Sequence, residues 1–127
     1  MRDNQSFFIC KHCGNLLGFI DDKGVPLTCC GEEMTELVAN TTEASTEKHL
    51  PAVTMEGAEL KVAVGSVLHP MEEAHHIKFI YVETENGGQR KSLKVGARPV
   101  ASFSFAEDKP VAVYEYCNLH GLWKTEL

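Results

Sequence analysis

The sequence predicts a mostly β protein: a small metal-binding knot followed by an antiparallel β-sandwich. Four of the five cysteines fall within residues 10–30, a region too small to form a hydrophobic core of its own. The remainder consists of short strand-like runs separated by turn signals, with no long helical pattern. At 127 residues, the chain has room for a small domain joined to a medium-sized one.

The cysteines of the knot are spaced as metal ligands. Cys10 and Cys13 are separated by two residues and followed by Gly14, which can adopt the positive φ that turns backbone N–H groups toward sulfur. Cys29 and Cys30 follow after fifteen further residues. Adjacent cysteines cannot form a second regular knuckle, so we expect a distorted tetrahedron of four thiolates. By spacing alone, such a site suits zinc and iron alike.

Short strands are predicted on both sides of a polar connection at residues 38–48. Those of the knot are Leu16–Ile20 and Val25–Thr28, joined by a turn at Asp21–Gly24. Those beyond the connection are Ala52–Met55, Leu60–Val64, Ile77–Thr84, Ser92–Val95, Val100–Phe105, Val111–Tyr116 and Leu122–Thr125, with a hairpin turn at Asn86-Gly87-Gly88. About seven strands at this spacing are typical of an immunoglobulin-like antiparallel β-sandwich.

The composition argues against several partners. A net charge of −6 disfavours nucleic acid, which usually meets a basic face. No apolar run approaches the roughly 18 residues that a membrane helix needs, and Met1-Arg2-Asp3-Asn4-Gln5 does not begin a signal peptide. We therefore expect no membrane partner and a cytoplasmic location. In that reducing compartment, an odd number of cysteines favours metal ligation over disulfides.

A second set of candidate ligands lies in the C-terminal part of the chain. Its members are His49, His69, His75, and the pair Cys117 and His120, which stand three positions apart after a predicted strand. A soft sulfur donor with several imidazoles is typical of an iron or copper centre. Because side chains alternate along a strand, only one of His75 and His76 can face the site. We assign His75 as the ligand, and expect His76 and His12 to be exposed.

The N-terminal cysteines resemble a known motif. Cys10-x2-Cys13-Gly14 followed by Cys29-Cys30-Gly31 is similar to the desulforedoxin motif, which holds one iron in a rubredoxin-like FeS4 centre. The resemblance covers residues 7–37 and favours iron over zinc.

Over most of its length the sequence resembles the desulfoferrodoxins, which are two-iron superoxide reductases. The matching segments are Glu47-Lys48-His49-Leu50-Pro51, His69-Pro70-Met71 with His75, and Cys117-Asn118-Leu119-His120-Gly121-Leu122-Trp123. The resemblance implies two irons per chain. The four knot cysteines would hold one in an FeS4 centre, and the catalytic iron would have four equatorial histidines, His49, His69, His75 and His120, with Cys117 axial. The family's catalytic glutamate and lysine fall on Glu47 and Lys48.

The same resemblance implies the organisation and the reaction. Residues 1–37 correspond to a desulforedoxin-like FeS4 domain, 38–48 to a linker, and 49–127 to a neelaredoxin-like superoxide reductase sandwich, paired as a homodimer. Four imidazoles and one thiolate leave one position of an octahedral iron open, where superoxide would be reduced to hydrogen peroxide. Lys48 is expected to attract the anion, and Glu47 to occupy the open position of oxidised iron. The expected electron donor is rubredoxin.

Two functions from other classes stay open at this point. A cupredoxin-like electron-transfer protein is also a β-sandwich and uses two histidines, one cysteine and a weak axial methionine. However, no methionine follows His120, and the histidines exceed the need. A non-catalytic, zinc-stabilised binding module explains the cysteine knot alone and gives the histidines no role.

Overall fold

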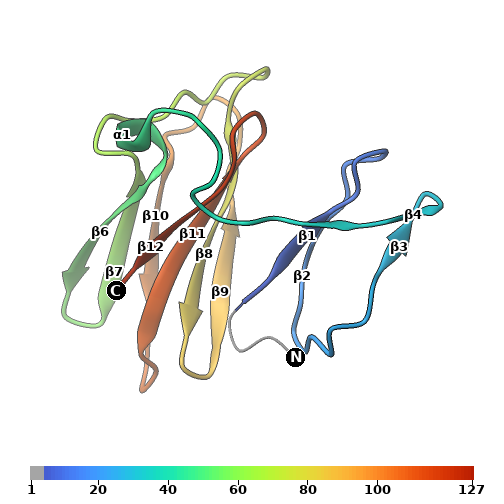
Figure 1. Cartoon of the computed structure of the whole chain (residues 1–127). Helices are drawn as coiled ribbons and strands as arrows, with labels where there is room; N and C mark the ends of the chain where they lie inside the picture. The colour runs from blue at the N-terminus through green and yellow to red at the C-terminus, as the bar shows by residue number, and fades with distance from the viewer. Residues whose placement is uncertain (1–4) are drawn as a thin grey trace. The chain divides into compact units, whose positions relative to one another are not determined.

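The chain forms two compact units, Met1–Val38 and Ala39–Leu127. The computed structural model describes residues 5–127. The prediction that Met1 to Gln5 does not begin a signal peptide therefore falls almost entirely outside the described residues. Strands with one short helix make up the regular structure of the described part, which confirms the predicted mostly β class (Figure 1). Within residues 5–127, no helix has the length and apolar character of a membrane span.

The first unit is a small antiparallel arrangement with few buried side chains. One sheet has the order β2-β1-β5, and a hairpin pairs β3 with β4; the strands are β1 Phe7–Ile9, β2 Leu16–Gly18, β3 Thr28–Cys29, β4 Glu32–Glu33 and β5 Thr35–Glu36. The predicted strand Leu16–Ile20 is therefore too long, and the predicted strand Val25–Thr28 is wrong except at Thr28, where β3 begins. Ile20 and Val25 are exposed, so no burial holds the chain extended at these positions.

The second unit is a sandwich of two antiparallel sheets. One sheet has the order β10-β7-β6 and the other β12-β11-β8-β9. The seven strands of residues 39–127 are β6 Pro51–Glu56, β7 Glu59–Val64, β8 Ile77–Thr84, β9 Gly87–Ser92, β10 Val100–Ser104, β11 Pro110–Cys117 and β12 Gly121–Glu126. Both sheets contribute side chains to one core, including Leu60, Val62 and Phe103 from the first and Ile80 and Val113 from the second.

The edge strand β9 differs from the prediction. The turn after β8 is Glu85-Asn86, and on either side of it Thr84 of β8 pairs with Gly87 of β9. The strand expected at Ser92–Val95 is thus wrong, because the strand ends at Ser92. All six β9 residues are exposed, so no hydrophobic alternation marks them, and backbone pairing with β8 defines the strand.

Three segments that carry candidate ligands gather at one end of the sandwich. They are the short helix α1 (Thr46–His49), the loop between β7 and β8, and the β11–β12 turn (Figure 1). The helix was not predicted; it is closed by a hydrogen bond of 3.0 Å from the Leu50 N–H to the Thr46 carbonyl.

Candidate metal centres

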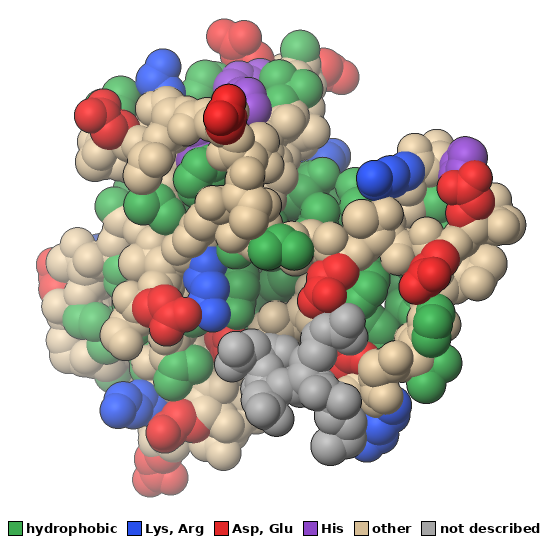
Figure 2. All heavy atoms as spheres, in the orientation of Figure 1, with side chains coloured by type: hydrophobic (Ala, Val, Ile, Leu, Met, Phe, Trp, Pro, Cys, Tyr) green, Lys and Arg blue, Asp and Glu red, His purple; other side chains and the backbone are tan. Residues whose placement is uncertain are grey.

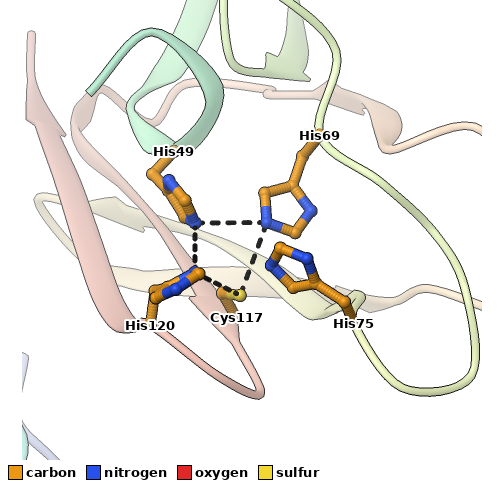
Figure 3. Close-up of side chains that lie close together, drawn as sticks. All are labelled: His49, His69, His75, Cys117 and His120. Carbon is orange, nitrogen blue, oxygen red and sulfur yellow. Dashed lines mark hydrogen bonds between the residues drawn. The ribbon is translucent and has the colours of Figure 1, made fainter. Parts of the chain in front are cut away.

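Five side chains from these three segments converge on one point. His49 comes from α1, His69 and His75 from the loop after β7, Cys117 from the end of β11, and His120 from the turn before β12 (Figure 3). One ligand atom from each lies within 4.8 Å of every other. The structure therefore brings together the five residues that the sequence assigned to the catalytic metal. Histidine side chains reach the surface at this end of the sandwich (Figure 2).

The donor atoms of this group are closely packed. His49 Nε2 lies 3.2 Å from His69 Nε2 and 3.1 Å from His120 Nδ1. Cys117 Sγ lies 3.4 Å from His69 Nε2 and 3.8 Å from His120 Nδ1. His49, His69 and Cys117 are buried, whereas His75 and His120 are half-buried. The site is therefore enclosed on the thiol side and more accessible on the side of His75 and His120.

Backbone carbonyls orient two of the imidazoles. His49 Nδ1 lies 2.7 Å from the Ser45 carbonyl oxygen, and His69 Nδ1 lies 2.7 Å from that of Pro70. A carbonyl oxygen only accepts hydrogen bonds, so each Nδ1 carries the proton and each Nε2 lone pair points into the site. Burial lowers the pKa of His49, and lowers the pKa of His69 to about 4. Both imidazoles are therefore neutral at neutral pH, which is the form that binds metals.

This arrangement fits a bound cation. The unprotonated Nε2 atoms of His49 and His69 face each other, and two facing lone pairs repel unless a cation lies between them. His75 Nε2 is buried and has no hydrogen-bond partner among the described residues. Burial raises the pKa of the Cys117 thiol, while the backbone N–H groups of Leu119 and His120 lower it, and a metal cation favours its thiolate. Four nitrogens and one sulfur suit a first-row transition metal such as iron.

Trp123 supports two of these ligands. Its ring stacks on that of His49, with centroids 5.0 Å apart and planes inclined by 25°. Its Nε1–H donates to the His120 carbonyl at 3.2 Å. Trp123 lies in one of the segments that resemble the family, but no role was predicted for it. Its contact with His49 joins residues far apart in the chain, so the sequence alone does not reveal it.

A buried carboxyl group lies near the thiol. Glu115 stands two residues before Cys117 on β11, is fully buried, and has no hydrogen-bond partner for either carboxyl oxygen among the described residues. Burial raises the pKa of Glu115 to about 9, so this carboxyl is neutral at neutral pH. No sequence signal separated it from an ordinary solvent-facing glutamate in a strand.

Glu47 and Lys48 are exposed residues of α1. Burial is the main cause of the lowered pKa of His49 and His75, and the positive charge of Lys48 contributes to both shifts. The charge of Lys48 therefore acts on the site. The carboxylate of Glu47 is not one of the grouped ligand atoms.

The two remaining histidines lie outside both ligand groups. His76 was expected to be exposed but is half-buried, and its Nδ1 lies 3.0 Å from the Glu72 carbonyl oxygen. His12 is exposed, as expected, and its Nε2 lies 3.0 Å from the Glu32 carboxylate.

The cysteines of the first unit form a second group. The sulfur atoms of Cys10, Cys13, Cys29 and Cys30 all lie within 4.8 Å of one another. Cys13 Sγ is 3.6 Å from Cys29 Sγ, which is too far for a disulfide of about 2.05 Å. Gly14 has a φ of +84°, as predicted, and Cys30 has a φ of +54°, a conformation uncommon outside glycine. This backbone conformation lets two adjacent cysteines contribute to one site.

The charges of four neighbouring sulfurs also favour a metal. The backbone N–H of Cys13 is the main cause that lowers the pKa of Cys10, to about 6. The neighbouring thiols raise the pKa of Cys29, and raise that of Cys30 to about 12. Four thiols this close together cannot all ionise to thiolates without a cation among them. A tetrahedral S4 set suits iron or zinc.

Comparisons with known proteins agree with both centres. Residues 41–126 match the family model described as desulfoferrodoxin. The desulfoferrodoxin of Nitratidesulfovibrio vulgaris is 42% identical over 126 residues, covering 99% of each chain. The solved superoxide reductase of Treponema pallidum superposes with a TM-score of 0.82 at 36% identity, covering 97% of this chain and 99% of that one. The one-iron superoxide reductase of Giardia intestinalis matches with a TM-score of 0.55 at 29% identity, covering 65% of this chain and 100% of that one. The chain belongs to the desulfoferrodoxin family.

Proposed function

We propose that this protein is a superoxide reductase. The observation that carries the proposal is the convergence of four imidazoles and one buried cysteine at one end of a β-sandwich, in a member of the desulfoferrodoxin family. The residues that would hold the catalytic iron are His49, His69, His75, His120 and Cys117. When bound there, the iron supplies one electron and an open position for a small anion.

The residues around the iron have separate tasks in this proposal. The carbonyls of Ser45 and Pro70 hold the imidazoles of His49 and His69 with their Nε2 atoms toward the metal. The Cys117 thiolate is shielded from water, because its residue is fully buried. Half-buried His75 and His120 leave access from solvent, which supplies the two protons that convert reduced superoxide into hydrogen peroxide.

Lys48 and Glu47 are the proposed catalytic side chains. Lys48 is exposed and its charge acts on two ligands, so it can draw superoxide toward the site of an otherwise acidic protein. Glu47 stands one residue before it on the same short helix, and its carboxylate would be a ligand of the iron in its oxidised form.

The four-cysteine group would hold the second iron. A site with four thiolates has no position left for substrate, which suits storage or passage of electrons. We propose residues 1–37 as the FeS4 domain, 38–48 as the linker and 49–127 as the catalytic domain; the end of the linker forms most of α1, which belongs to the second unit. An external donor of rubredoxin type, a homodimer and a cytoplasmic location are part of the same proposal.

The other two functions are not favoured. A copper electron-transfer site of cupredoxin type needs two histidines, whereas four imidazoles join the group. A zinc-stabilised binding module uses the cysteines of the first unit and leaves the five-residue group without a role.

The products of the reaction test the proposed function. Reduced, iron-loaded protein should consume superoxide and form one hydrogen peroxide for each superoxide, without releasing dioxygen. A dismutase would release dioxygen together with peroxide. Formation of dioxygen, or no acceleration over spontaneous decay, would contradict the proposal; protein oxidised beforehand and given no donor is the control.

A further inference from the structure

Gly65 lies in close contact with the backbone of α1. Its φ is +83°, and a Cβ atom placed on it would lie 2.7 Å from the Glu47 carbonyl oxygen and 2.7 Å from the Lys48 carbonyl carbon. The same atom would lie 2.4 Å from the Val67 carbonyl oxygen. All three neighbours are backbone atoms, so no change of side-chain rotamer could relieve the overlap. Only glycine permits this approach.

Hydrogen bonds join the two segments that meet at Gly65. The Gly65 N–H donates to the Leu50 carbonyl at 3.0 Å, and the Val67 N–H donates to the Glu47 carbonyl at 3.2 Å. The Ser66 hydroxyl donates to the same Glu47 oxygen at 3.3 Å. The turn after β7 is thereby tied to Glu47 within the helix and to Leu50 directly after it.

The contact joins two segments that each carry a metal ligand. His49 ends α1, and His69 follows the turn, where its N–H donates to the Val64 carbonyl at 3.1 Å. Figure 3 shows the His49 ring below α1 and the His69 ring on the neighbouring loop, with their Nε2 atoms 3.2 Å apart. Any change in the separation of the two backbones therefore changes the distance between these imidazoles.

We propose that Gly65 is a positioning residue for the catalytic centre. It sets the distance between α1 and the His69 loop, and so determines where Glu47, Lys48 and His49 stand relative to His69. This role deepens the proposed superoxide reductase function and rests on it for the effect on rate. A side chain at position 65 pushes the Glu47–Lys48 peptide away from the loop, because contacts under 3.0 Å cannot persist.

Gly57 provides a matched control. It also has a left-handed backbone, with a φ of +62°, but a Cβ there would meet nothing within 4 Å. It lies in the β6–β7 turn, outside both ligand groups. Alanine at position 57 therefore introduces the φ strain alone, whereas alanine at position 65 adds clashes with α1 and with the Val67 carbonyl of its own turn.

The test compares Gly65→Ala and Gly57→Ala in the iron-loaded full chain. Three quantities are measured: iron per chain, the thiolate-to-iron absorption of the Cys117 centre, and the rate constant with superoxide. For Gly65→Ala we expect a shifted absorption and a rate lowered by up to about 100-fold, since a misplacement of about 1 Å can have an effect of this size. The absorption of the four-cysteine centre should not change. Gly57→Ala should keep the wild-type spectrum and rate.

Two outcomes would overturn the role of Gly65. One is a wild-type spectrum and rate in Gly65→Ala; the other is an equal loss in both variants, which would indicate backbone strain alone. If Gly65→Ala does not fold, Ser66→Ala replaces it, because it removes one hydrogen bond to Glu47 without adding atoms. Ser66→Ala should shift the absorption in the same direction, and a wild-type spectrum would then reject the proposal. The spectra decide the role of Gly65 even if the wild-type protein fails to reduce superoxide.

Discussion

Cys117→Ser is expected to abolish the thiolate-to-iron absorption of the catalytic centre and to lower the superoxide rate constant by more than about 100-fold. Loss of a residue that only supports a ligand costs about 10- to 100-fold, and Cys117 supplies the one sulfur of the five-residue group. A serine hydroxyl is a harder donor with a much higher pKa than a thiol, so it does not replace the thiolate. Optical spectra and stopped-flow mixing with superoxide measure the two effects.

The same variant contains its own control. Cys10, Cys13, Cys29 and Cys30 form a separate group in the first unit, so the absorption of the FeS4 centre should persist. Persistence of that absorption shows that the first unit is folded and loaded with iron, and the far-UV circular dichroism of the strands reports on the second unit. Unchanged superoxide reactivity in such a preparation would exclude Cys117 as a ligand of the catalytic iron.

Lys48→Ala is expected to slow the reaction with superoxide by about 10- to 100-fold at low ionic strength, because a locally charged cleft accelerates association by about 10- to 1,000-fold and Lys48 supplies part of that charge. Lys48 is exposed and its charge already contributes to the lowered pKa of His49 and His75. The difference from the wild type should shrink as salt is added, because the Debye length falls to about 10 Å at 0.1 M. The measurement is the rate constant as a function of ionic strength.

Lys61→Ala is the matched control for this effect. It removes the same unit of charge from β7, where Lys61 Nζ pairs with the Glu56 carboxylate at 3.3 Å. If steering is local to Lys48, the Lys61 variant should react at the wild-type rate, and Lys48→Arg should recover most of the loss. Equal slowing by both alanine variants would show that net charge, and not Lys48, governs association.

The ligands were predictable from the sequence because their chemistry is unusual. Thiols and imidazoles at these spacings are typical of metal sites; strand alternation indicated that only one of His75 and His76 can face the site, and the family resemblance placed His75 among the ligands. The structure places His75 in the group and leaves His76 outside it. Residue type and spacing indicated the candidates, and the family resemblance completed the assignment.

The supporting residues were not predictable for an equally physical reason. Gly65 and Trp123 act through contacts with α1 and His49, and such contacts exist only after distant segments have packed. The same limit applies to strand β9, whose exposed residues carry no hydrophobic pattern and whose pairing is made by backbone groups. Sequence period reports burial, so elements without burial are not visible to it.

A crystal structure of the iron-loaded chain, with anomalous diffraction measured across the iron absorption edge, would examine the two centres directly. We expect two iron peaks per chain, one among the four cysteines of the first unit and one bonded to His49, His69, His75, His120 and Cys117. A single peak confined to the cysteines, or a zinc signal there with no metal among the imidazoles, would leave the chain without the centre on which superoxide reduction depends.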